Sequence, residues 1–459
     1  MKCLIIAAGA GTRLYRINKA DSKPLLPLLG LPLIERTILT AHKAGIQEFY
    51  VVTGYNSKKL CTFLESLAKR RGLNIKTLFN EEWEKGNGLS VLKGKEVLIE
   101  NFVLLMSDHL FDEEIVKDLT KQEIGEDEVI LAVDFRVDKN EFVDQDDVTR
   151  VLCKDDKIVN IGKHIEDYNC YDTGIFLCSP AIFSAIERSA KEKNDFSLSG
   201  GMKILSSEGK ARVFDIGERF WLDVDDEKAF KKGEEYLLKG LTKSSDGPVS
   251  RYLNRPVSKI FTKSLVKTSL TPNQISFLTF LLSLVAAALI FFEDYLFLAL
   301  GGVLVQISSI ADGSDGEVAR LKFQVSEFGG WFDAVLDRYA DAIILFALVW
   351  HAFYFSPGFF ITEIEKGVVL FVGMLAIIGS FMNSYTADKY DGLMKKRIAD
   401  EAEKSGSYFR IGRDVRLFLV FLGCVLYILF PILLILAFVM NIENIRRVIL
   451  CSGERKTFH

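Results

Sequence analysis

The chain has 459 residues, of which 49% are hydrophobic and 26% are charged, and its formal net charge is −4. This slightly negative balance argues against a polyanion such as a nucleic acid as its partner. The seven cysteines form no CxxC pair, so the sequence predicts neither a disulfide framework nor a zinc site. Apolar and charged residues are segregated: residues 1–260 look soluble, whereas residues 275–450 hold most of the long apolar runs. We therefore expect a soluble half followed by a membrane-embedded half.

A glycine-rich loop follows the first expected strand. Residues 1–8 (MKCLIIAA) form an apolar run typical of a buried parallel strand, and residues 9–13 (GAGTR) follow directly. Leu14 stands where a dinucleotide-binding GxGxxG needs its third glycine, which excludes that kind of site. The free N–H groups of such a loop still suit a phosphate chain. Together with residues 23–38 (KPLLPLLGLPLIERTI), the loop resembles the signature of nucleotidyltransferases that join an NTP to a sugar or polyol phosphate.

This resemblance implies a Rossmann-like α/β fold with a mostly parallel sheet and with ligands at the carboxyl ends of the strands. It implies that the loop binds the nucleotide phosphates and that the small residues of segment 86–90 read the base. Asp108, which follows the strand-like VLLMS, would hold Mg²⁺, and either Asp223 or Asp225 would supply the second metal carboxylate. The implied nucleotide-binding residues are Ala8, Gly9, Gly11, Thr12, Arg13, Lys23, Gly88 and Ser90, of which Arg13 and Lys23 are also implied in catalysis.

On the acceptor side, the same resemblance implies that Lys163 contacts phosphate and that Asp172 and Thr173 contact the polyol. A solvated lysine is the alternative for Lys163, and an ordinary turn is the alternative for Asp172.

The chain becomes charged and then rich in Ser and Gly near residue 240. This change in composition predicts a soluble domain over 1–232, which the resemblance implies to be a nucleotidyltransferase (cytidylyltransferase) domain, a linker over 233–250 and a membrane domain over 251–450. Residues 251–267 mix basic and apolar side chains at helical spacing, which predicts a juxtamembrane helix on the cytoplasmic surface. A solvated linker helix is the alternative for this segment.

We expect an all-α membrane domain with about six spans. Several of the apolar runs are shorter than the ~20 residues that a span usually needs, and the last two are separated only around Pro431, where one long helix is an alternative. An even number of spans puts both termini on one side, and the basic loops of that side place the soluble domain and both active sites in the cytoplasm. The sequence thus predicts a multi-pass protein of the cell membrane. The expected spans are 275–292, 295–311, 331–355, 367–386, 414–430 and 432–448.

Residues 312–341 (DGSDGEVARLKFQVSEFGGWFDAVLDRYAD) carry the main acidic motif of the membrane half. Asp312 and Asp315 share a helical face at i,i+3, and Asp333 and Asp337 share one at i,i+4. Two facing helices would place four carboxylates around one point, where negative charge is costly unless cations compensate it. Mg²⁺, or alternatively Mn²⁺, suits such oxygen ligands and bridges them to phosphates, whereas acids paired with arginines across a packing face are the other interpretation. The spacing resembles the signature of the CDP-alcohol phosphotransferases: Asp-x-x-Asp-Gly-x-x-Ala-Arg, eight residues, then Gly-x-x-x-Asp-x-x-x-Asp.

The second resemblance implies that Asp312, Asp315 and Asp333 grip the metal ions, and that Asp337, at the same metal site, removes the proton from the acceptor hydroxyl. Arginines that recur every three residues at the start of a later span could form an anion site for the acceptor, with anchoring at the membrane face as the alternative. The implied nucleotide ligands are Gly316, Ala319 and Arg320, and the candidate acceptor ligands are Arg410, Arg413 and Arg416.

The two halves together resemble the bifunctional CTP:inositol-1-phosphate cytidylyltransferases/di-myo-inositol-phosphate-phosphate synthases. Because a CDP-alcohol links the two chemistries, the fusion favours CTP as the nucleotide. The resemblance implies that CTP and inositol 1-phosphate give CDP-inositol and pyrophosphate. CDP-inositol and a second inositol 1-phosphate then give a phosphorylated di-inositol phosphodiester and CMP, in the biosynthesis of a compatible solute. We also expect a homodimer formed through the membrane domain. One alternative is that the same two chemistries make a phospholipid headgroup. Another is an inactive membrane scaffold, and the intact acidic residues argue against it.

Overall fold

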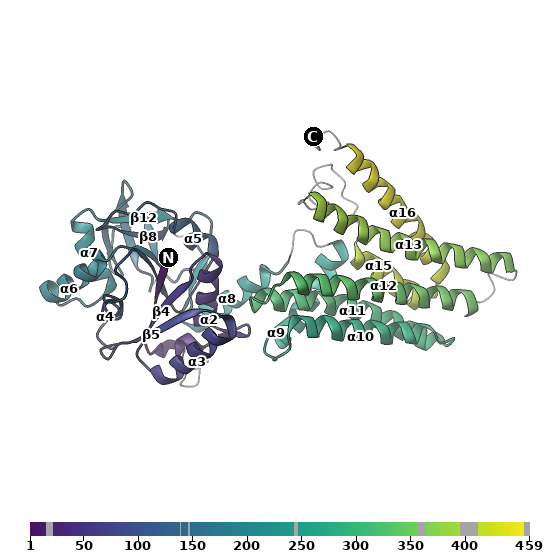
Figure 1. The fold of residues 1–459 in the computed structure, drawn as a ribbon, viewed down its shortest axis with the longest axis horizontal. Helices are drawn as coiled ribbons and strands as arrows, with labels where there is room; N and C mark the ends of the chain where they lie inside the picture. Colours follow the sequence, from purple (N-terminus) through teal and green to yellow (C-terminus); the bar gives the residue numbers. More distant parts are fainter. Residues whose placement is uncertain are drawn as a thin grey trace. The chain divides into compact units, whose positions relative to one another are not determined.

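The computed structural model describes residues 1–14, 22–137, 139–145, 147–242, 247–355, 363–394 and 412–453. The chain divides into two compact units, Met1–Leu237 and Leu238–His459, which Figure 1 draws with their helices and strands labelled. Helix α8 (Glu227–Lys239) spans this boundary, so the part of the expected linker from 233 to 239 is helical.

The first unit is built around a mixed sheet, and its described part has nine strands in the order β5-β4-β1-β6-β11-β8-β12-β10-β9. Neighbours from β5 to β6 are parallel, as are β8 and β12, whereas β11 is antiparallel to β6, β8 and β9. The expectation of a mostly parallel sheet is therefore wrong, and parallel order is confined mainly to the half that carries the glycine loop. The strands are β1 (Lys2–Ala7), β4 (Glu48–Thr53), β5 (Asn74–Phe79), β6 (Phe102–Met106), β8 (Val129–Asp134), β9 (Arg150–Lys154), β10 (Lys157–Gly162), β11 (Cys170–Cys178) and β12 (Ala211–Asp215).

A tight hairpin between β9 and β10 contributes to the antiparallel half. Its two turn residues, Asp155 and Asp156, have φ values of 49° and 60°. Two consecutive positive φ values define the type I′ turn, whose twist matches that of the strands it joins. Such a turn joins two neighbouring strands as an antiparallel pair, whereas the helix–strand alternation expected from the sequence would join parallel strands.

Helices enclose the sheet and explain why its central strands are apolar along their whole length. Leu4 and Ile6 of β1 pack in one cluster with buried residues of α4 (Asn87–Leu92), α6 (Ala181–Lys193) and α7 (Leu198–Ser207). A strand covered on both faces has no side that water selects for polar residues. The other elements of this unit are α2 (Leu33–Lys43), α3 (Ser57–Arg71), α5 (Glu113–Leu119), the 3₁₀ turns η1 (Thr12–Leu14) and η2 (Lys23–Leu25), and the two-stranded pairs β2 (Pro27–Leu28) with β3 (Leu31–Pro32) and β7 (His109–Phe111) with β13 (Trp221–Asp223).

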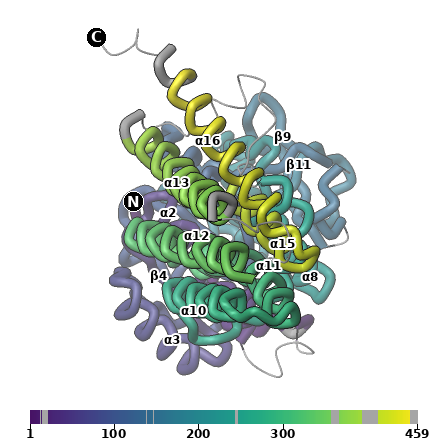
Figure 2. Tube along the Cα trace, turned by 90° about the vertical axis from the view of Figure 1, so that its right-hand side faces the viewer, coloured from purple at the N-terminus to yellow at the C-terminus, as the bar shows by residue number. Residues whose placement is uncertain are grey.

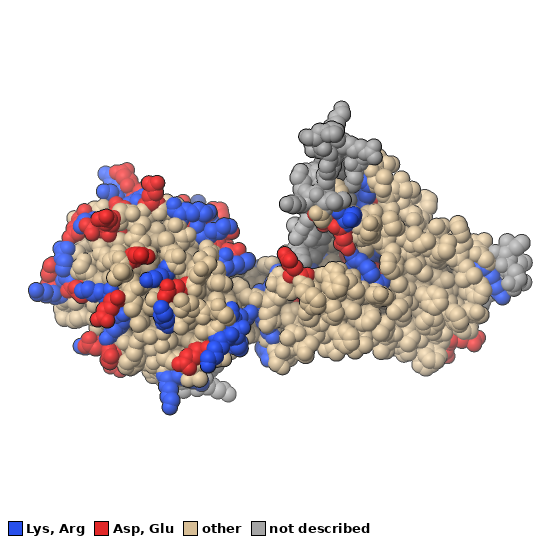
Figure 3. Space-filling view, in the orientation of Figure 1, with Lys and Arg blue, Asp and Glu red and all other residues tan. Residues whose placement is uncertain are grey.

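The second unit is a bundle of long helices. Helix α10 packs against α11 and α12, α11 packs against α15, and α13 packs against both α12 and α16. Figure 2 shows α13 and α16 lying side by side. In Figure 3 the bundle shows a broad uncharged surface, whereas the first unit is covered with both signs of charge. The helices are α9 (Arg255–Leu265), which follows the π-turn η3 (Ser250–Asn254), α10 (Pro272–Ile290), α11 (Tyr295–Leu321), α12 (Glu327–Phe355), α13 (Glu363–Met394), α15 (Arg413–Leu426) and α16 (Leu429–Gly453).

In the described part of the chain, four helices are long and apolar enough to cross a membrane: Pro272–Ile290, Tyr295–Leu321, Lys366–Gly392 and Leu429–Ile449. The two other expected spans coincide with α12, whose first half carries the acids, and with α15, which has only 14 residues. At 1.5 Å per residue, α15 is about 21 Å long, which is shorter than the ~30 Å hydrocarbon core. The long-helix alternative at Pro431 is wrong, because the chain breaks at Tyr427, where φ is 58°, and Pro431 lies in the first turn of α16.

Helix α9 is held against α11 by a buried charge. Glu317 of α11 is fully buried and accepts hydrogen bonds from Arg255 (2.7 Å), Ser258 (2.8 Å) and Thr262 (2.6 Å). The opposite side of α9 exposes apolar residues, including Ile260 and Phe261. Because a buried carboxylate needs several partners, this contact fixes α9 beside the helix that carries the acidic motif. The apolar outer side favours a juxtamembrane helix over a solvated linker.

Candidate active sites

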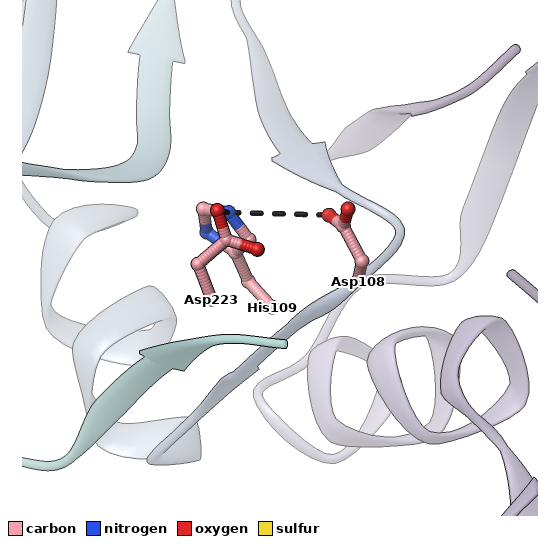
Figure 4. Close-up of side chains that lie close together, drawn as sticks. All are labelled: Asp108, His109 and Asp223. Carbon is pink, nitrogen blue, oxygen red and sulfur yellow. Dashed lines mark ion pairs between the residues drawn. The ribbon is translucent and has the colours of Figure 1, made fainter. Parts of the chain in front are cut away.

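The first candidate site forms at the end of β6, beside the short β7–β13 pair. Asp108 lies between β6 and β7, and β13 pairs with β7 so that Asp223 stands opposite His109. Figure 4 shows the side chains of Asp108, His109 and Asp223 close together. Lys23 reaches the same point, with its Nζ 2.5 Å from Asp108 Oδ2 and 3.6 Å from Asp223 Oδ1. A basic side chain therefore lies between the two carboxylates that we expect to bind a metal ion.

Gly11 brings the glycine loop against Lys23. Its φ is +62°, and a Cβ at this position would lie 2.3 Å from the Cβ of Lys23. Both the conformation and the contact exclude a larger residue. Gly9 is exposed with open space around its Cα, which leaves the backbone of this loop accessible to a ligand.

A pocket of about 250 Å³ opens beside this cluster, and Lys163, Asp172 and Asp225 are among the residues that line it. Arg13 Nη1 lies 2.7 Å from the carboxylates of both Asp147 and Asp225, and Lys163 Nζ lies 2.6 Å from Asp147. The expected phosphate-binding cations are thus already paired with acids. A phosphate that enters the pocket must replace these carboxylates as their partner.

Burial and charge together shift the protonation of this site. Burial opposes the charge of Lys23, but Asp108 and Asp223 outweigh it and hold the pKa of Lys23 above its ordinary value. Burial likewise opposes the charge of His109, while Asp223 and then Asp108 raise its pKa to about 9. Burial raises the pKa of Asp172 to about 6, and burial followed by the neighbouring Asp223 does the same for Asp225. The positive groups are stabilised, and two of the acids hold protons more readily than usual.

Three expected ligands do not face this pocket. The Thr173 side chain is fully buried and donates to the Ala132 carbonyl (2.8 Å), so the expected polyol contact of Thr173 is not supported. Successive residues of a strand point to opposite faces, and Asp172, its neighbour, is the one that lines the pocket.

Gly88 and Ser90, the expected base-reading residues of segment 86–90, also do not face this pocket. The Gly88 amide donates to the Phe196 carbonyl (3.0 Å), and the buried Ser90 hydroxyl accepts from Asn80 (3.0 Å). Both residues therefore hold α4 in place. The side chain of Thr12, an expected ligand from the glycine loop, lies outside the described part of the structure.

The second candidate site lies in the helical unit, where α11 and α12 bring three carboxylates together. Oxygens of Asp312 on α11 and of Asp333 and Asp337 on α12 lie within 4.8 Å of one another. Asp315 is turned to a neighbouring contact, since it accepts from the Ser276 hydroxyl of α10 and from the Gly316 amide. The i,i+3 and i,i+4 spacings thus do place acids of two helices around one point.

Arg413, at the start of α15, inserts into these acids. Its Nη1 lies 2.9 Å from Asp312 and 2.8 Å from Asp337, and its Nε lies 2.9 Å from Asp341. Arg416, one turn later, is buried and contacts Asp341 (3.0 Å) and the Ser380 hydroxyl (2.7 Å). The guanidinium of Arg413 compensates the negative charge of these carboxylates. Charged side chains inside a membrane protein need such a partner of opposite charge.

The other expected ligands of the second site lie close by or outside the described residues. Arg320 donates from Nη2 to the Leu241 carbonyl (3.1 Å), and Gly316 leaves room beside the Arg320 guanidinium. Ala319 is buried on the same helix. Arg410 lies outside the described residues.

Comparison with known proteins identifies both halves. Residues 3–198 match the model of the MobA-like NTP transferase domain, and residues 269–445 match that of the CDP-alcohol phosphatidyltransferases. The bifunctional IPC transferase and DIPP synthase of Aquifex aeolicus is 32% identical over 446 residues, which cover 96% of each chain. That of Rubrobacter xylanophilus is 34% identical over 456 residues, which cover 98% of this chain and 96% of the relative. The chain belongs to the family of bifunctional IPC transferases and DIPP synthases.

Among solved structures, this chain is similar to the inositol-1-phosphate CTP transferase from T. maritima, with 26% sequence identity and a TM-score of 0.46. The similarity covers 51% of this chain and 93% of that chain.

Sequence reasoning missed three residues at the two sites of this family member. His109 directly follows Asp108, and an imidazole beside a strand-end acid is a signal that could have marked it. Ser276 lies in the first turns of α10, where its hydroxyl reaches Asp315 across helices. Asp147 lies in the loop before β9, and nothing in its local sequence indicates that it pairs with Arg13 and Lys163.

Proposed function

We propose that the N-terminal half transfers a cytidylyl group from CTP to inositol 1-phosphate, which gives CDP-inositol and pyrophosphate. The acceptor phosphate attacks the α-phosphorus of CTP, and pyrophosphate leaves. Arg13 and Lys23 bind the triphosphate in this proposal, and Lys163 and Asp172 bind the acceptor in the pocket beside them. Lys163 and Asp172 line one pocket with Asp108 and Asp225, and Lys23 and Arg13 pair with these two acids, which supports the proposal. The loop backbone from Gly9 to Gly11 remains our assignment for phosphate contacts.

The residues of the first site fit a divalent metal ion. Asp223 Oδ1 is buried and makes no hydrogen bond within the described structure, and the Lys23 ammonium lies 3.6 Å away, whereas a buried carboxylate oxygen normally has a close hydrogen-bond partner. Asp108 contributes a second carboxylate at the same point, whereas Asp225 pairs with Arg13. We therefore assign Asp108 and Asp223 as the metal carboxylates. Mg²⁺ or Mn²⁺ held there would neutralise charge on the triphosphate and on the departing pyrophosphate.

The C-terminal half, in this proposal, passes the inositol phosphoryl group from CDP-inositol to a second inositol 1-phosphate. Asp337 accepts the proton of the attacking hydroxyl, the new P–O bond forms at the phosphorus that bears inositol, and CMP leaves. Arg413 and Arg416 carry the positive charge that suits the phosphate of the acceptor, and Arg320 suits the diphosphate. The carboxylates of Asp312 and Asp333, with Asp315 beside them, fit one or more hard divalent ions. Such ions would stabilise the charge on departing CMP.

One observation carries the proposal: each half of one chain brings its expected acids together, and the whole chain aligns with bifunctional relatives from end to end. We further propose that α12 and α15 cross the membrane with the other four helices, with the bilayer thinned locally around the short α15. In this proposal both active sites face the cytoplasm, and the membrane half forms a homodimer. The excess of Lys and Arg in the loops next to the acidic motif supports this orientation. Protease protection in sealed vesicles tests the orientation, and the mass of the detergent-solubilised chain tests the dimer.

The decisive experiment supplies the purified full chain with CTP, Mg²⁺ and labelled inositol 1-phosphate, and follows the products by mass. We expect CDP-inositol to appear first and a water-soluble phosphodiester to appear as it is consumed. Label that partitions into organic solvent would instead identify a lipid product. An absence of any cytidylylated product would refute the first half of the proposal, and CDP-inositol that is never consumed would refute the second.

A further inference from the structure

His109 is the one group of the first acid cluster to which the proposed function assigns no task. Its Nε2 lies 3.6 Å from Asp223 Oδ2 and 3.9 Å from Asp108 Oδ1. One ligand atom from each of these three residues lies within 4.8 Å of the others. This spacing suits three ligands around one ion, because Zn²⁺-type ions bind imidazole nitrogen and carboxylate oxygen at ~2.0–2.2 Å.

A single hydrogen bond sets the orientation of the imidazole. Nδ1 of His109 lies 2.8 Å from the backbone carbonyl of Thr173. A carbonyl only accepts, so Nδ1 carries a hydrogen, and Nε2 is the nitrogen that faces the two carboxylates and can bind an ion in place of a proton. Metal-binding histidines typically donate their second nitrogen in this way, which fixes the ring and increases its basicity.

The fold also leaves a specific space for this ring. Gly174 has a φ of +73°, and a Cβ there would lie 2.4 Å from Cε1 of His109. The Asp172 carboxylate accepts the Gly174 amide (2.8 Å) and so holds the backbone in this conformation. A glycine at this turn of β11 is therefore required both by the positive φ of the backbone and by the position of His109.

From this geometry we infer that His109 is the third protein ligand of the metal ion that Asp108 and Asp223 hold for cytidylyl transfer. The inference deepens the proposed function, on which it rests for the purpose of the ion. One nitrogen ligand in an otherwise oxygen site shifts its preference from Mg²⁺ towards Mn²⁺, Co²⁺ and Zn²⁺, because imidazole suits the transition metals and Mg²⁺ prefers oxygen.

The test is pulsed electron paramagnetic resonance of bound Mn²⁺, which detects nitrogen coordinated directly to the ion and needs no turnover. The full chain carries Asp312→Asn and Asp333→Asn, so that the acids of the second site do not compete for Mn²⁺. We expect ¹⁴N modulation that changes to the ¹⁵N pattern when the chain is made with ¹⁵N-histidine. This isotope comparison requires no substitution at His109 and does not depend on whether a variant folds.

Two variants in the same background complete the test. His109→Gln should lose the nitrogen modulation and weaken Mn²⁺ binding roughly tenfold or more, since even changing the hydrogen-bond partner of a ligand typically costs about 10–100-fold. His42→Gln is the matched control, because His42 lies at the end of α2 and its Nδ1 donates to the backbone carbonyl of Ile46 rather than to an acid of the site. Bound Mn²⁺ without nitrogen modulation, or modulation that persists in His109→Gln, overturns the inference.

The two proposals fail separately. A chain that forms CDP-inositol while its Mn²⁺ shows no nitrogen ligand refutes only the assignment of His109. A chain whose Mn²⁺ is bound through His109 but whose second-site background yields no CDP-inositol refutes the proposed function of the N-terminal half.

Discussion

Replacement of Arg413 by alanine should make the stability of the helical unit depend on Mg²⁺. The Arg413 side chain is 17% exposed and contacts Asp312, Asp337 and Asp341 at 2.8–2.9 Å. Without it, two of the three clustered acids lose their nearest cation, while Asp341 keeps Arg416. A divalent ion can then take the place of the guanidinium.

The size of the effect follows from the number and burial of these contacts. Removing one partner of a buried ion pair typically costs about 3–5 kcal/mol. For a unit of 150–250 residues, about 2–4 °C of Tm corresponds to 1 kcal/mol, so Tm in EDTA should fall by about 6–20 °C. In the wild-type chain Mg²⁺ must displace Arg413 from Asp312 and Asp337, whereas in the variant it meets free carboxylates. Binding that is tenfold tighter adds about 1.4 kcal/mol, which should enlarge the Mg²⁺-induced rise in Tm by about 3–6 °C.

The assay is thermal unfolding of the detergent-solubilised chain in EDTA and in excess Mg²⁺. Arg416→Ala is the matched control: it lies one turn further along α15, is more deeply buried with a side chain 7% exposed, and contacts Asp341 and Ser380 rather than Asp312 or Asp337. It should destabilise the unit by a similar amount in both conditions. Equal Mg²⁺-induced shifts in the wild-type chain and both variants would show that Arg413 and the metal ion do not share the same acids.

Three further outcomes are expected. Asp108→Asn should abolish CDP-inositol formation but leave consumption of supplied CDP-inositol intact, and near-normal cytidylyl transfer would rule out its metal role. Asp337→Asn should accumulate CDP-inositol, since loss of a general base typically costs about 10²–10⁴-fold, so more than about a tenth of wild-type transfer would contradict the assignment. Burial alone would raise the pKa of Asp134, but hydrogen bonds from Arg136, Trp221 and Asn140 outweigh it and hold the pKa below its ordinary value. Its ionised form therefore stabilises the fold above the ordinary range of about pH 3.9, and this contribution is lost as the pH falls. Asp134→Asn should accordingly destabilise the first unit at pH 7 in urea titrations, with a difference from wild type that shrinks below about pH 4, and a difference independent of pH would contradict this explanation.

Local spacing determined the acidic motif of the helical unit from sequence alone. A helix returns to the same face every three or four residues, so Asp333 and Asp337 had to point the same way once α12 was recognised. The start of α10 is equally local, because the Thr271 side chain caps the helix in a reciprocal hydrogen-bond pair with Gln274. The type I′ turn at Asp155 and Asp156 belongs to the same class of signal, although the expectation of a mostly parallel sheet overlooked it.

Only the tertiary structure decided which distant groups meet. Arg413 lies far along the chain from Asp312, and its contact with the acids depends on α15 packing against α11. The pairing of His109 with Asp223 likewise depends on β13 adding to β7 in one register. Sequence spacing restricts the distance between neighbours within one helix or strand, but the distance between elements is set by which apolar faces pack together. For this reason the motifs indicated which residues carry the chemistry, and the packing inside each unit decided which cation or imidazole accompanies each acid.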